Sequence, residues 1–292
     1  MRYILLSSVK NEEKYISHTI KAVISQTCKP QKWIIVNDGS KDATENIIKE
    51  FQKEYSFIQL IQIQDRGSRN FSSKVFALTY AYQNLENIRY DFIGILDGDI
   101  TLPPNYYEIM FSKFIQNPKL GIAGGEFYDV HKHKEYKIHP SPNSVRGGVQ
   151  LFRRECYEDI GGLSPFRYGG EDTVAEVSAR MYGWEVKTFS DVTARHHRIT
   201  GTAITSKAQA TYRQGMIEFT LGYHPLFEII KCIKRLNENP VMIGSICRFL
   251  GYSISALIRR KKEVTNDFVE FLRKEQIDRV KSVLFFKNQH SH

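Results

Sequence analysis

Cysteine is scarce in this 292-residue chain, and the four that occur are widely separated, at Cys28, Cys156, Cys232 and Cys247. The sequence has no C-x-x-C pair and no close Cys/His spacing, which excludes the usual zinc motifs. We therefore expect four reduced thiols and neither disulfides nor bound zinc. Also missing are G-x-G-x-x-G and G-x-x-x-x-G-K-S/T, which excludes the usual dinucleotide-binding and P-loop devices.

A secretory signal and a strong compositional bias are missing as well. The apolar run after Met1-Arg2 ends before Lys10, so it is too short for the apolar core of a signal peptide. We therefore expect a cytoplasmic location. With 41% hydrophobic and 25% charged residues, the composition is that of a globular protein. The length allows one large domain, or a main domain with an appendage.

Positive charge, in contrast, is plentiful and unevenly distributed. Residues 222–292 contain 13 Lys or Arg against 7 Asp or Glu, so they carry +6 of the formal net charge of +9. A basic segment of this kind predicts an anionic partner, for which nucleic acid and anionic lipid are the two candidates.

Apolar strands alternate with helical segments in the first hundred residues. Strands are predicted at residues 3–8, 33–36, 57–63 and 90–96, and helices at residues 12–25 and 42–55. Continuously apolar strands separated by helices are typical of a parallel sheet that is covered on both faces. The predicted fold class is therefore α/β, with a Rossmann-like, mostly parallel sheet and helices on both faces.

Polar side chains follow each of these four strands. They are Asn11 and Glu12 after the first strand, Asp38 and Ser40 after the second, Asp65, Gly67 and Arg69 after the third, and Asp97 and Asp99 after the fourth. Because the carboxyl ends of parallel strands open into loops at one edge of the sheet, we expect one ligand site there. Acidic side chains suit sugar hydroxyls and base edges, while a metal and the Arg69/Lys74 pair would bind phosphate.

Asp97 and Asp99 are separated by one glycine, and Pro103-Pro104 prevents the strand from continuing. Carboxylates of this kind suit Mg²⁺ or Mn²⁺, which complete their coordination with water and substrate phosphate. The alternative is an Asp-Gly turn with two solvated acids. The polar loops after the other three strands favour the metal site.

The second hundred residues contain a less regular pattern. A helix is predicted at residues 106–115, a strand at 121–125 and another strand at 145–153. Between these two strands, residues 127–144 carry three histidines without a fixed helical or strand spacing. We expect this segment to form a solvated loop over the cleft.

Two further groups of polar residues follow. Glu171-Asp172 stand at a predicted helix start after two glycines, where they serve either as acids stabilised by the helix dipole or as a general base. His196-His197 come after a strand predicted at residues 184–188. A histidine at this place could ligate a metal or could be a packed or solvated side chain.

Taken in order, these residues resemble the family 2 glycosyltransferases of the GT-A fold, of the bacterial polysaccharide type. The matching segments are S-S-V-K-N-E-E, V-N-D-G-S, R-G-S-R-N, L-D-G-D, G-G-E-D and H-H-R-I-T-G. The resemblance covers residues 1–205, with a nucleotide-sugar half over about 1–100 and an acceptor half over about 101–205. It departs from the family pattern in the third loop, which lacks a second glycine after Asn70, and in the tandem histidines.

The resemblance implies a role for several residues. Asp38 would bind the nucleotide base, Asp97 the ribose or the metal, and Asp99 the metal that bridges the diphosphate. Asp172, beside Glu171, would deprotonate the acceptor hydroxyl. His196, chosen over His197 by its spacing to Arg198, would be a further metal or diphosphate contact.

The predicted function is an inverting, metal-dependent glycosyltransferase that uses a nucleotide-sugar donor, with a UDP-sugar favoured. The acceptor would be a glycan or a lipid-linked saccharide in cell-surface polysaccharide synthesis. Inversion is favoured because only one candidate base is evident, although Glu126 or Asp129 could enter the site. One alternative is a sugar nucleotidyltransferase, which would normally have a glycine-rich, basic first loop. The other is a non-catalytic nucleotide-sugar or glycan-binding module, which would not need Asp172.

Residues 206–292 are predicted to form a helical, basic extension. Apolar residues recur at helical spacing between 241 and 258, and Arg259-Arg260-Lys261-Lys262 follow directly. The segment 241–262 packs on the catalytic domain or lies on an anionic membrane surface, and a membrane span is the lesser alternative because Arg248 and several Gly and Ser residues interrupt it. Nucleic acid fits poorly, because the sequence has no nucleic-acid reader motif.

Overall fold

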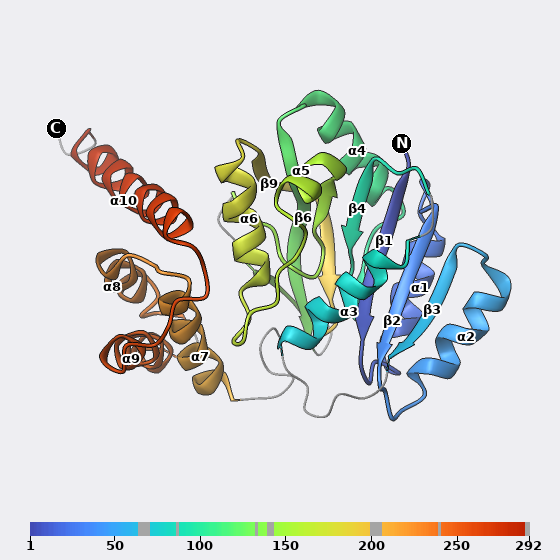
Figure 1. Ribbon diagram of the computed structural model, residues 1–292, viewed down its shortest axis with the longest axis horizontal. Helices are drawn as coiled ribbons and strands as arrows, with labels where there is room; N and C mark the ends of the chain where they lie inside the picture. The colour runs from blue at the N-terminus through green and yellow to red at the C-terminus, as the bar shows by residue number, and fades with distance from the viewer. Residues whose placement is uncertain are drawn as a thin grey trace. The chain divides into compact units, whose positions relative to one another are not determined.

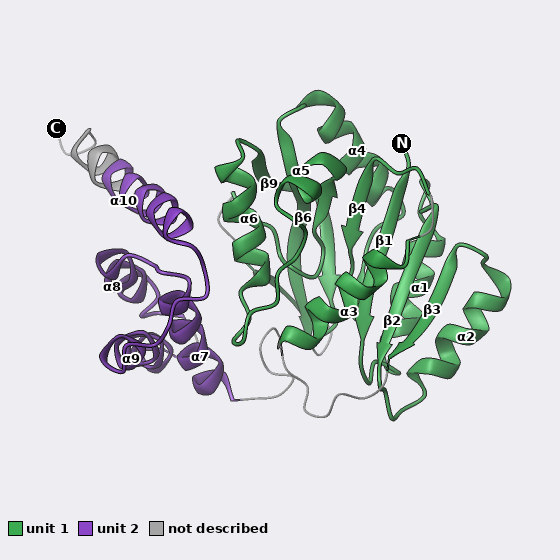
Figure 2. Ribbon diagram, in the orientation of Figure 1, with its two compact units in different colours: residues 1–200 green, residues 201–292 purple. Residues whose placement is uncertain are grey.

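The structure is a computed structural model, and it describes residues 1–63, 71–85, 88–131, 134–138, 143–198, 206–238 and 241–289. The chain divides into two compact units, residues 1–200 and residues 201–292, which are coloured separately in Figure 2. Unit 1 contains a β-sheet with helices, and the described part of unit 2 is helical (Figure 1). The predicted α/β fold with a C-terminal helical extension is therefore confirmed.

Nine strands of the described residues form one sheet in unit 1, in the order β3-β2-β1-β4-β8-β6-β9-β5, with β7 paired to β6. They are β1 (Tyr3–Val9), β2 (Lys32–Asp38), β3 (Ile58–Ile63), β4 (Phe92–Ile95), β5 (Ile100–Thr101), β6 (Leu120–His131), β7 (Lys134–Ile138), β8 (Leu151–Arg153) and β9 (Glu185–His196). Strands β1 to β4 are parallel, and β8 lies antiparallel between β4 and β6. The predicted mostly parallel sheet is present.

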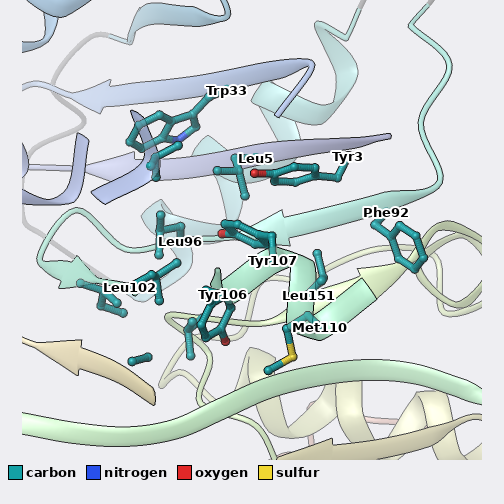
Figure 3. Close-up of a cluster of buried hydrophobic side chains, with 14 of the residues drawn as sticks. Tyr3, Leu5, Trp33, Phe92, Leu96, Leu102, Tyr106, Tyr107, Met110 and Leu151 are labelled. Atoms are coloured by element: carbon teal, nitrogen blue, oxygen red, sulfur yellow. The ribbon is translucent and has the colours of Figure 1, made fainter. Parts of the chain in front are cut away.

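Six helices in the described part of unit 1 cover both faces of this sheet. They are α1 (Ile16–Ile24), α2 (Thr44–Glu54), α3 (Phe71–Gln83), α4 (Tyr106–Gln116), α5 (Arg154–Asp159) and α6 (Glu171–Met181). Leu5 and Trp33 point into one apolar cluster with α1, α2 and α4, part of which is drawn in Figure 3. Leu6 and Ile34 point into the opposite cluster, with α3, α5 and α6. Burial on both faces explains why these strands are continuously apolar.

The middle of unit 1 differs from the sequence prediction. Residues 127–131 continue strand β6, which forms a hairpin with β7 in place of the expected loop over the cleft. Strand β9 continues from Glu185 through His196, because β6 pairs with it in parallel along that length. In the predicted strand at 145–153 only β8 forms, since a turn at Gly147-Gly148 precedes it.

Unit 2 consists of α7 (Lys207–Thr220), α8 (Pro225–Lys234), α9 (Ile243–Leu257) and α10 (Asn266–Gln289). A capping box of Ser206 and Gln209 begins α7. Helices α7 and α9 approach closely at two glycines: a Cβ on Gly215 would lie 1.9 Å from the carbonyl oxygen of Arg248, and one on Gly251 would lie 2.0 Å from that of Tyr212. Over the described residues, no helix is long and apolar enough to cross a membrane.

Candidate active site

The first two loops at the carboxyl edge of the sheet are joined by hydrogen bonds. The backbone N–H of Asn11 donates to Ser40 Oγ at 2.9 Å, and the N–H of Lys41 donates to Asn11 Oδ1 at 2.8 Å. Ser40 Oγ in turn donates to Asn37 Oδ1 at 2.6 Å. These bonds hold the end of β2, where the buried side chain of Asp38 lies, at a fixed place beside β1.

Asp97 follows β4 and is paired with a lysine from α3. Lys74 Nζ lies 2.6 Å from Asp97 Oδ1, and the N–H of Asp97 donates to the carbonyl of Gly148 at 2.9 Å. Burial alone would lower the pKa of Lys74, but the carboxylates of Asp97, Glu171 and Asp172 outweigh it and raise that pKa above its ordinary value. Lys74 is therefore charged, and it lies within the electrostatic field of Asp97 and of the Glu171-Asp172 pair.

The turn at Gly147-Gly148 lies against both Asp97 and Asp172. A Cβ on Gly148 would lie 2.7 Å from Asp97 Oδ2, and one on Gly147 would lie 2.9 Å from the Cβ of Asp172. Any side chain here would displace one of the two carboxylates. The apolar pattern at residues 145–153 predicted a strand through these glycines and not this turn, although two adjacent glycines are a turn signal.

Glu171 and Asp172 begin helix α6. Gly169 and Gly170 precede them with φ of 97° and 102°, a left-handed conformation that favours glycine. The N–H of Thr173 donates to Asp172 Oδ1 at 2.7 Å, so one carboxylate oxygen is oriented by its own helix. Burial raises the pKa of Glu171, and the neighbouring charge of Asp172 adds to the shift.

Asp99 is buried beside the ring of His196. His196 Nε2 lies 3.3 Å from Asp99 Oδ2, and His196 Nδ1 lies 2.8 Å from Asp129 Oδ1. Strand register produces this arrangement, because His196 on β9 pairs with Ile100 on β5 and with Asp129 on β6. Burial opposes protonation of the ring, but hydrogen bonds and charge from Asp129 and Asp99 raise the pKa of His196 to about 9.

Arg198 is the second cation on Asp99. Its Nε lies 2.9 Å from Asp99 Oδ2, and its guanidinium also pairs with the buried Glu12. Although burial would raise the pKa of Asp99, His196 and Arg198 hold it below its ordinary value. The backbone N–H of His197 donates to the carbonyl of Asp99 at 2.9 Å, but its ring contacts a different residue, with Nε2 2.9 Å from Thr101 Oγ1. Of the two tandem histidines, His196 is the one beside Asp99.

Asp99 and His196 are spaced like two adjacent ligands of a divalent cation. Adjacent ligands of an octahedral Mg²⁺ at about 2.1 Å lie about 3 Å apart, close to the 3.3 Å between Asp99 Oδ2 and His196 Nε2. No group of three or more His, Cys, Asp or Glu in the described residues is arranged to hold a metal ion. Asp99 and His196 therefore fit a cation that takes its remaining ligands from water and phosphate, and it would displace the ring proton.

Several residues named from the sequence lie outside the part of the chain that the structure describes. Asp65, Gly67 and Arg69 of the third loop, and His133 and His139 of the histidine segment, lie outside the described residues. Sequence reasoning also missed Asp129 as a partner of His196. The sequence gives no local signal for this contact, because the pairing of β6 with β9 brings Asp129 to His196.

The fold and this carboxylate-rich sheet edge define a class, the GT-A glycosyltransferases. Similar solved structures include Staphylococcus aureus TarS 1-349 in complex with UDP-GlcNAc, with a TM-score of 0.56 and 13% identity over 94% of this chain and 83% of that chain. Another is the mannosyltransferase PcManGT from Pyrobaculum calidifontis in complex with GDP-Man and Mn²⁺, with a TM-score of 0.55 and 14% identity over 93% and 78%. At these identities the likeness shows the fold alone, and it confirms the predicted GT-A architecture.

The chain belongs to the family described as Glycosyl transferase family 2, whose model matches residues 6–170, more than half of its length. A poly-beta-1,6-N-acetyl-D-glucosamine synthase of Staphylococcus epidermidis is 31% identical over 201 residues, 61% of this chain and 45% of that protein. The putative glycosyltransferase EpsH of Bacillus subtilis is 32% identical over 136 residues, 46% of this chain and 37% of that protein. The chain thus spans less than half the length of these relatives.

Proposed function

We propose that this chain transfers a sugar from a nucleoside-diphosphate donor, with inversion, to a glycan or lipid-linked saccharide acceptor. The observation that carries the proposal is the position of Lys74, which pairs with Asp97 and lies in the field of Glu171 and Asp172. A donor phosphate and an acceptor hydroxyl would meet between these groups. The names of the relatives, which include a poly-N-acetylglucosamine synthase, support an acceptor that is a growing polysaccharide.

The donor is best matched by a UDP-sugar. Asp38, buried at the end of β2, suits the imide of uracil, although guanine or thymine also presents an N–H to a carboxylate. Asp97 suits a ribose hydroxyl, and Lys74 suits the diphosphate. The first two loops, which contain Asn11, Glu12 and Ser40, would support these donor contacts. The UDP-GlcNAc complex of TarS supports the same choice of donor.

A Mg²⁺ or Mn²⁺ ion would be held by Asp99 and His196, with Asp97 as the further ligand that the sequence predicts. When bound, such an ion supplies positive charge to the diphosphate as it leaves. Arg198, which already contacts Asp99, adds a fixed positive charge at the same place. The Mn²⁺ in the complex of PcManGT supports this choice of ion.

Asp172 is proposed as the base. Its carboxylate accepts the proton of the acceptor hydroxyl while the hydroxyl oxygen bonds to the anomeric carbon and the bond from that carbon to the diphosphate breaks. One displacement inverts the anomeric centre. Glu171, beside Asp172 at the start of α6, would hydrogen-bond the acceptor sugar.

The test is nucleoside-diphosphate release from UDP-, GDP- and dTDP-sugars, with and without Mn²⁺, in the presence of oligosaccharide or lipid-linked acceptors. We expect one donor to be turned over, with a requirement for metal. The Asp99→Asn and Asp172→Asn variants should lose turnover, while Asp191→Asn, at an exposed ion pair with Lys113, should keep it. Binding of a donor without turnover under all these conditions would favour the non-catalytic binding module.

We also propose that the enzyme works at the cytoplasmic face of the membrane, where lipid-linked saccharides are extended. The basic segment 241–262 is the part of the chain that supports this placement.

A further inference from the structure

Helix α9 buries its small and polar side chains and exposes its apolar ones, which is the reverse of a helix on a water-facing surface. Its buried residues are small or polar, namely Gly244, Ser245, Arg248, Gly251, Tyr252 and Ser255. Its exposed residues include Ile243, Ile246, Phe249, Leu250, Ile254 and Leu257. Ile246 is 51% exposed and Leu257 is 81% exposed, so these side chains have no cover in the described structure.

The exposed apolar surface extends to the neighbouring helix. Helix α8 packs beside α9 (Figure 1) and exposes Leu226, Ile229 and Ile233 at helical spacing. Val241 and Met242, just before α9, are more than half exposed as well. Together with Leu236 and Ile258, these segments hold 13 of the 20 large exposed apolar side chains of the described chain. We call the set between Leu226 and Ile258 the apolar face.

Ionisable groups, in contrast, lie inside unit 2. Glu218 is fully buried, where it accepts a hydrogen bond from Arg248 Nη1 at 2.5 Å and pairs with Lys231. Glu228, one turn before Cys232 on α8, is also fully buried. Buried charges are costly unless they are paired, and large exposed apolar patches mark surfaces that bind something. The arrangement suits a unit whose outer face contacts an apolar phase.

A basic cluster is joined directly to the apolar face. Arg259, Arg260, Lys261 and Lys262 follow the last turn of α9, and Arg259 and Lys261 are exposed. An apolar surface bordered by cations is complementary to an anionic bilayer, where lipid tails adjoin negative headgroups.

The dimensions favour a position in the interface. The 15 residues of α9 extend about 22 Å at 1.5 Å per residue, less than the roughly 30 Å of a hydrocarbon core. We propose that the apolar face docks on an anionic lipid bilayer, with α9 lying in the plane of the interface and residues 259–262 contacting headgroups. The proposal does not depend on the catalytic one, but it would bring the enzyme to acceptors carried on lipid.

The experiment is co-sedimentation of the full chain with vesicles of phosphatidylglycerol or of phosphatidylcholine. We expect binding to phosphatidylglycerol vesicles that weakens with salt, and weaker binding to phosphatidylcholine. Ile246→Ser combined with Leu250→Ser should reduce binding by about tenfold or more. Ile115→Ser combined with Tyr182→Ser, at similarly exposed positions of unit 1, should leave binding unchanged.

Hydrogen exchange of the wild-type chain gives a second measurement that needs no variant. Anionic vesicles should slow exchange over residues 241–262 and leave α4 unaffected. The proposal is overturned if the wild type does not sediment with anionic vesicles, or if the apolar-face variant binds as well as the wild type. It is also overturned if the face instead buries itself in a dimer that the same variant dissociates.

Hydrolysis of a soluble donor separates this proposal from the catalytic one. The apolar-face variant should retain donor hydrolysis without vesicles. A variant that no longer binds vesicles but hydrolyses the donor fully tests the membrane proposal alone. A chain that binds vesicles but does not hydrolyse any donor contradicts the catalytic proposal alone.

Discussion

Asp129 is the residue that holds His196 toward Asp99. It is buried, and its Oδ1 lies 2.8 Å from His196 Nδ1 while His196 Nε2 faces Asp99. Carboxylates that bond to the far nitrogen of a ligating histidine fix the orientation and tautomer of the ring. Asp129 is therefore a positioning residue for the proposed metal site.

Asp129→Asn should raise the Mn²⁺ concentration for half-maximal turnover by roughly 10- to 100-fold, the usual cost of losing such a partner. Turnover at saturating Mn²⁺ should largely recover, because Asp99 and His196 are still present. The measurement is a Mn²⁺ titration of donor turnover, with Asp191→Asn as the control. An unchanged Mn²⁺ dependence would show that Asp129 does not act through the metal site.

Asp172→Asn keeps the shape of the side chain and removes the proposed base. Turnover should fall by about 10²- to 10⁴-fold, since general-base catalysis contributes roughly that factor. Affinity for UDP should stay the same, because Asp172 is proposed to contact the acceptor. Steady-state kinetics and a UDP titration together check this, with Glu158→Gln, at an exposed ion pair with Arg154, as the control. A loss of UDP affinity with unchanged turnover contradicts the assignment.

Among the elements, the α7–α9 pair depends most directly on small residues. A Cβ on Gly251 would lie 2.0 Å from the carbonyl oxygen of Tyr212, so the two helices would have to separate. Gly251→Ala should therefore destabilise unit 2 by about 1–3 kcal/mol or more, despite the better helix propensity of alanine. Urea unfolding monitored by circular dichroism measures the change. Ser253→Ala on the same helix should be nearly neutral, and equal stabilities for the two variants would show that the close approach is wrong.

The two buried glutamates of unit 2 should respond to pH in opposite ways. Burial raises the pKa of Glu228 to about 8, and the charge of Glu218 adds to the shift. Lys231 and Arg248 instead lower the pKa of Glu218 to about 2 against the opposing effect of burial. Between pH 4.5 and 8 the folded chain thus retains a proton on Glu228 that the unfolded chain releases, so stability falls as pH rises through this window.

Glu228→Gln should remove that part of the pH dependence and make the chain more stable than the wild type at pH 8. Glu218→Gln should destabilise at the same pH, because it leaves the buried Arg248 and the partly buried Lys231 without their carboxylate partner. The comparison is made by measuring unfolding midpoints at about pH 5, 6.5 and 8, which together span this window. A Glu228→Gln variant that is less stable than wild type at pH 8 contradicts the account.

Local pattern was sufficient for the elements that form the donor side. Strands β1, β2 and β4 are short apolar runs that end in polar loops, and both faces of each are buried. Their order along the chain and the rule that ligands bind at carboxyl ends were enough to bring Asp38, Asp97 and Asp99 to one edge. The predicted roles of these residues toward a donor stay predictions.

Pattern failed where a residue acquires its neighbour through distant pairing. Asp129 and His196 are 67 residues apart, and only the parallel pairing of β6 with β9 brings them together. Residues 189–196 of β9 are largely polar or partly exposed, so no apolar run marked them as strand. Gly147 and Gly148 form a turn because the backbone must pass close to Asp97 and Asp172, a requirement that single-sequence periodicity does not contain.

At the scale of the whole molecule, the two units carry different properties. The family match covers residues 6–170, so helix α6 with Asp172, the whole of β9 with His196, and all of unit 2 lie beyond it. Unit 1 holds the acidic candidate site, and the segment 222–292 holds +6 of the net charge of +9. A negatively charged donor and an anionic surface are thus the proposed partners of different units.

The central claim is that the sheet edge binds a nucleoside diphosphate together with a divalent metal at Asp99. The most direct measurement is calorimetric titration of UDP into the full chain, with Mn²⁺ and with chelator. The account predicts binding that needs Mn²⁺, is lost in Asp99→Asn and is retained in Asp191→Asn. Equal affinity with and without Mn²⁺, or full Mn²⁺-dependent binding by Asp99→Asn, would contradict it.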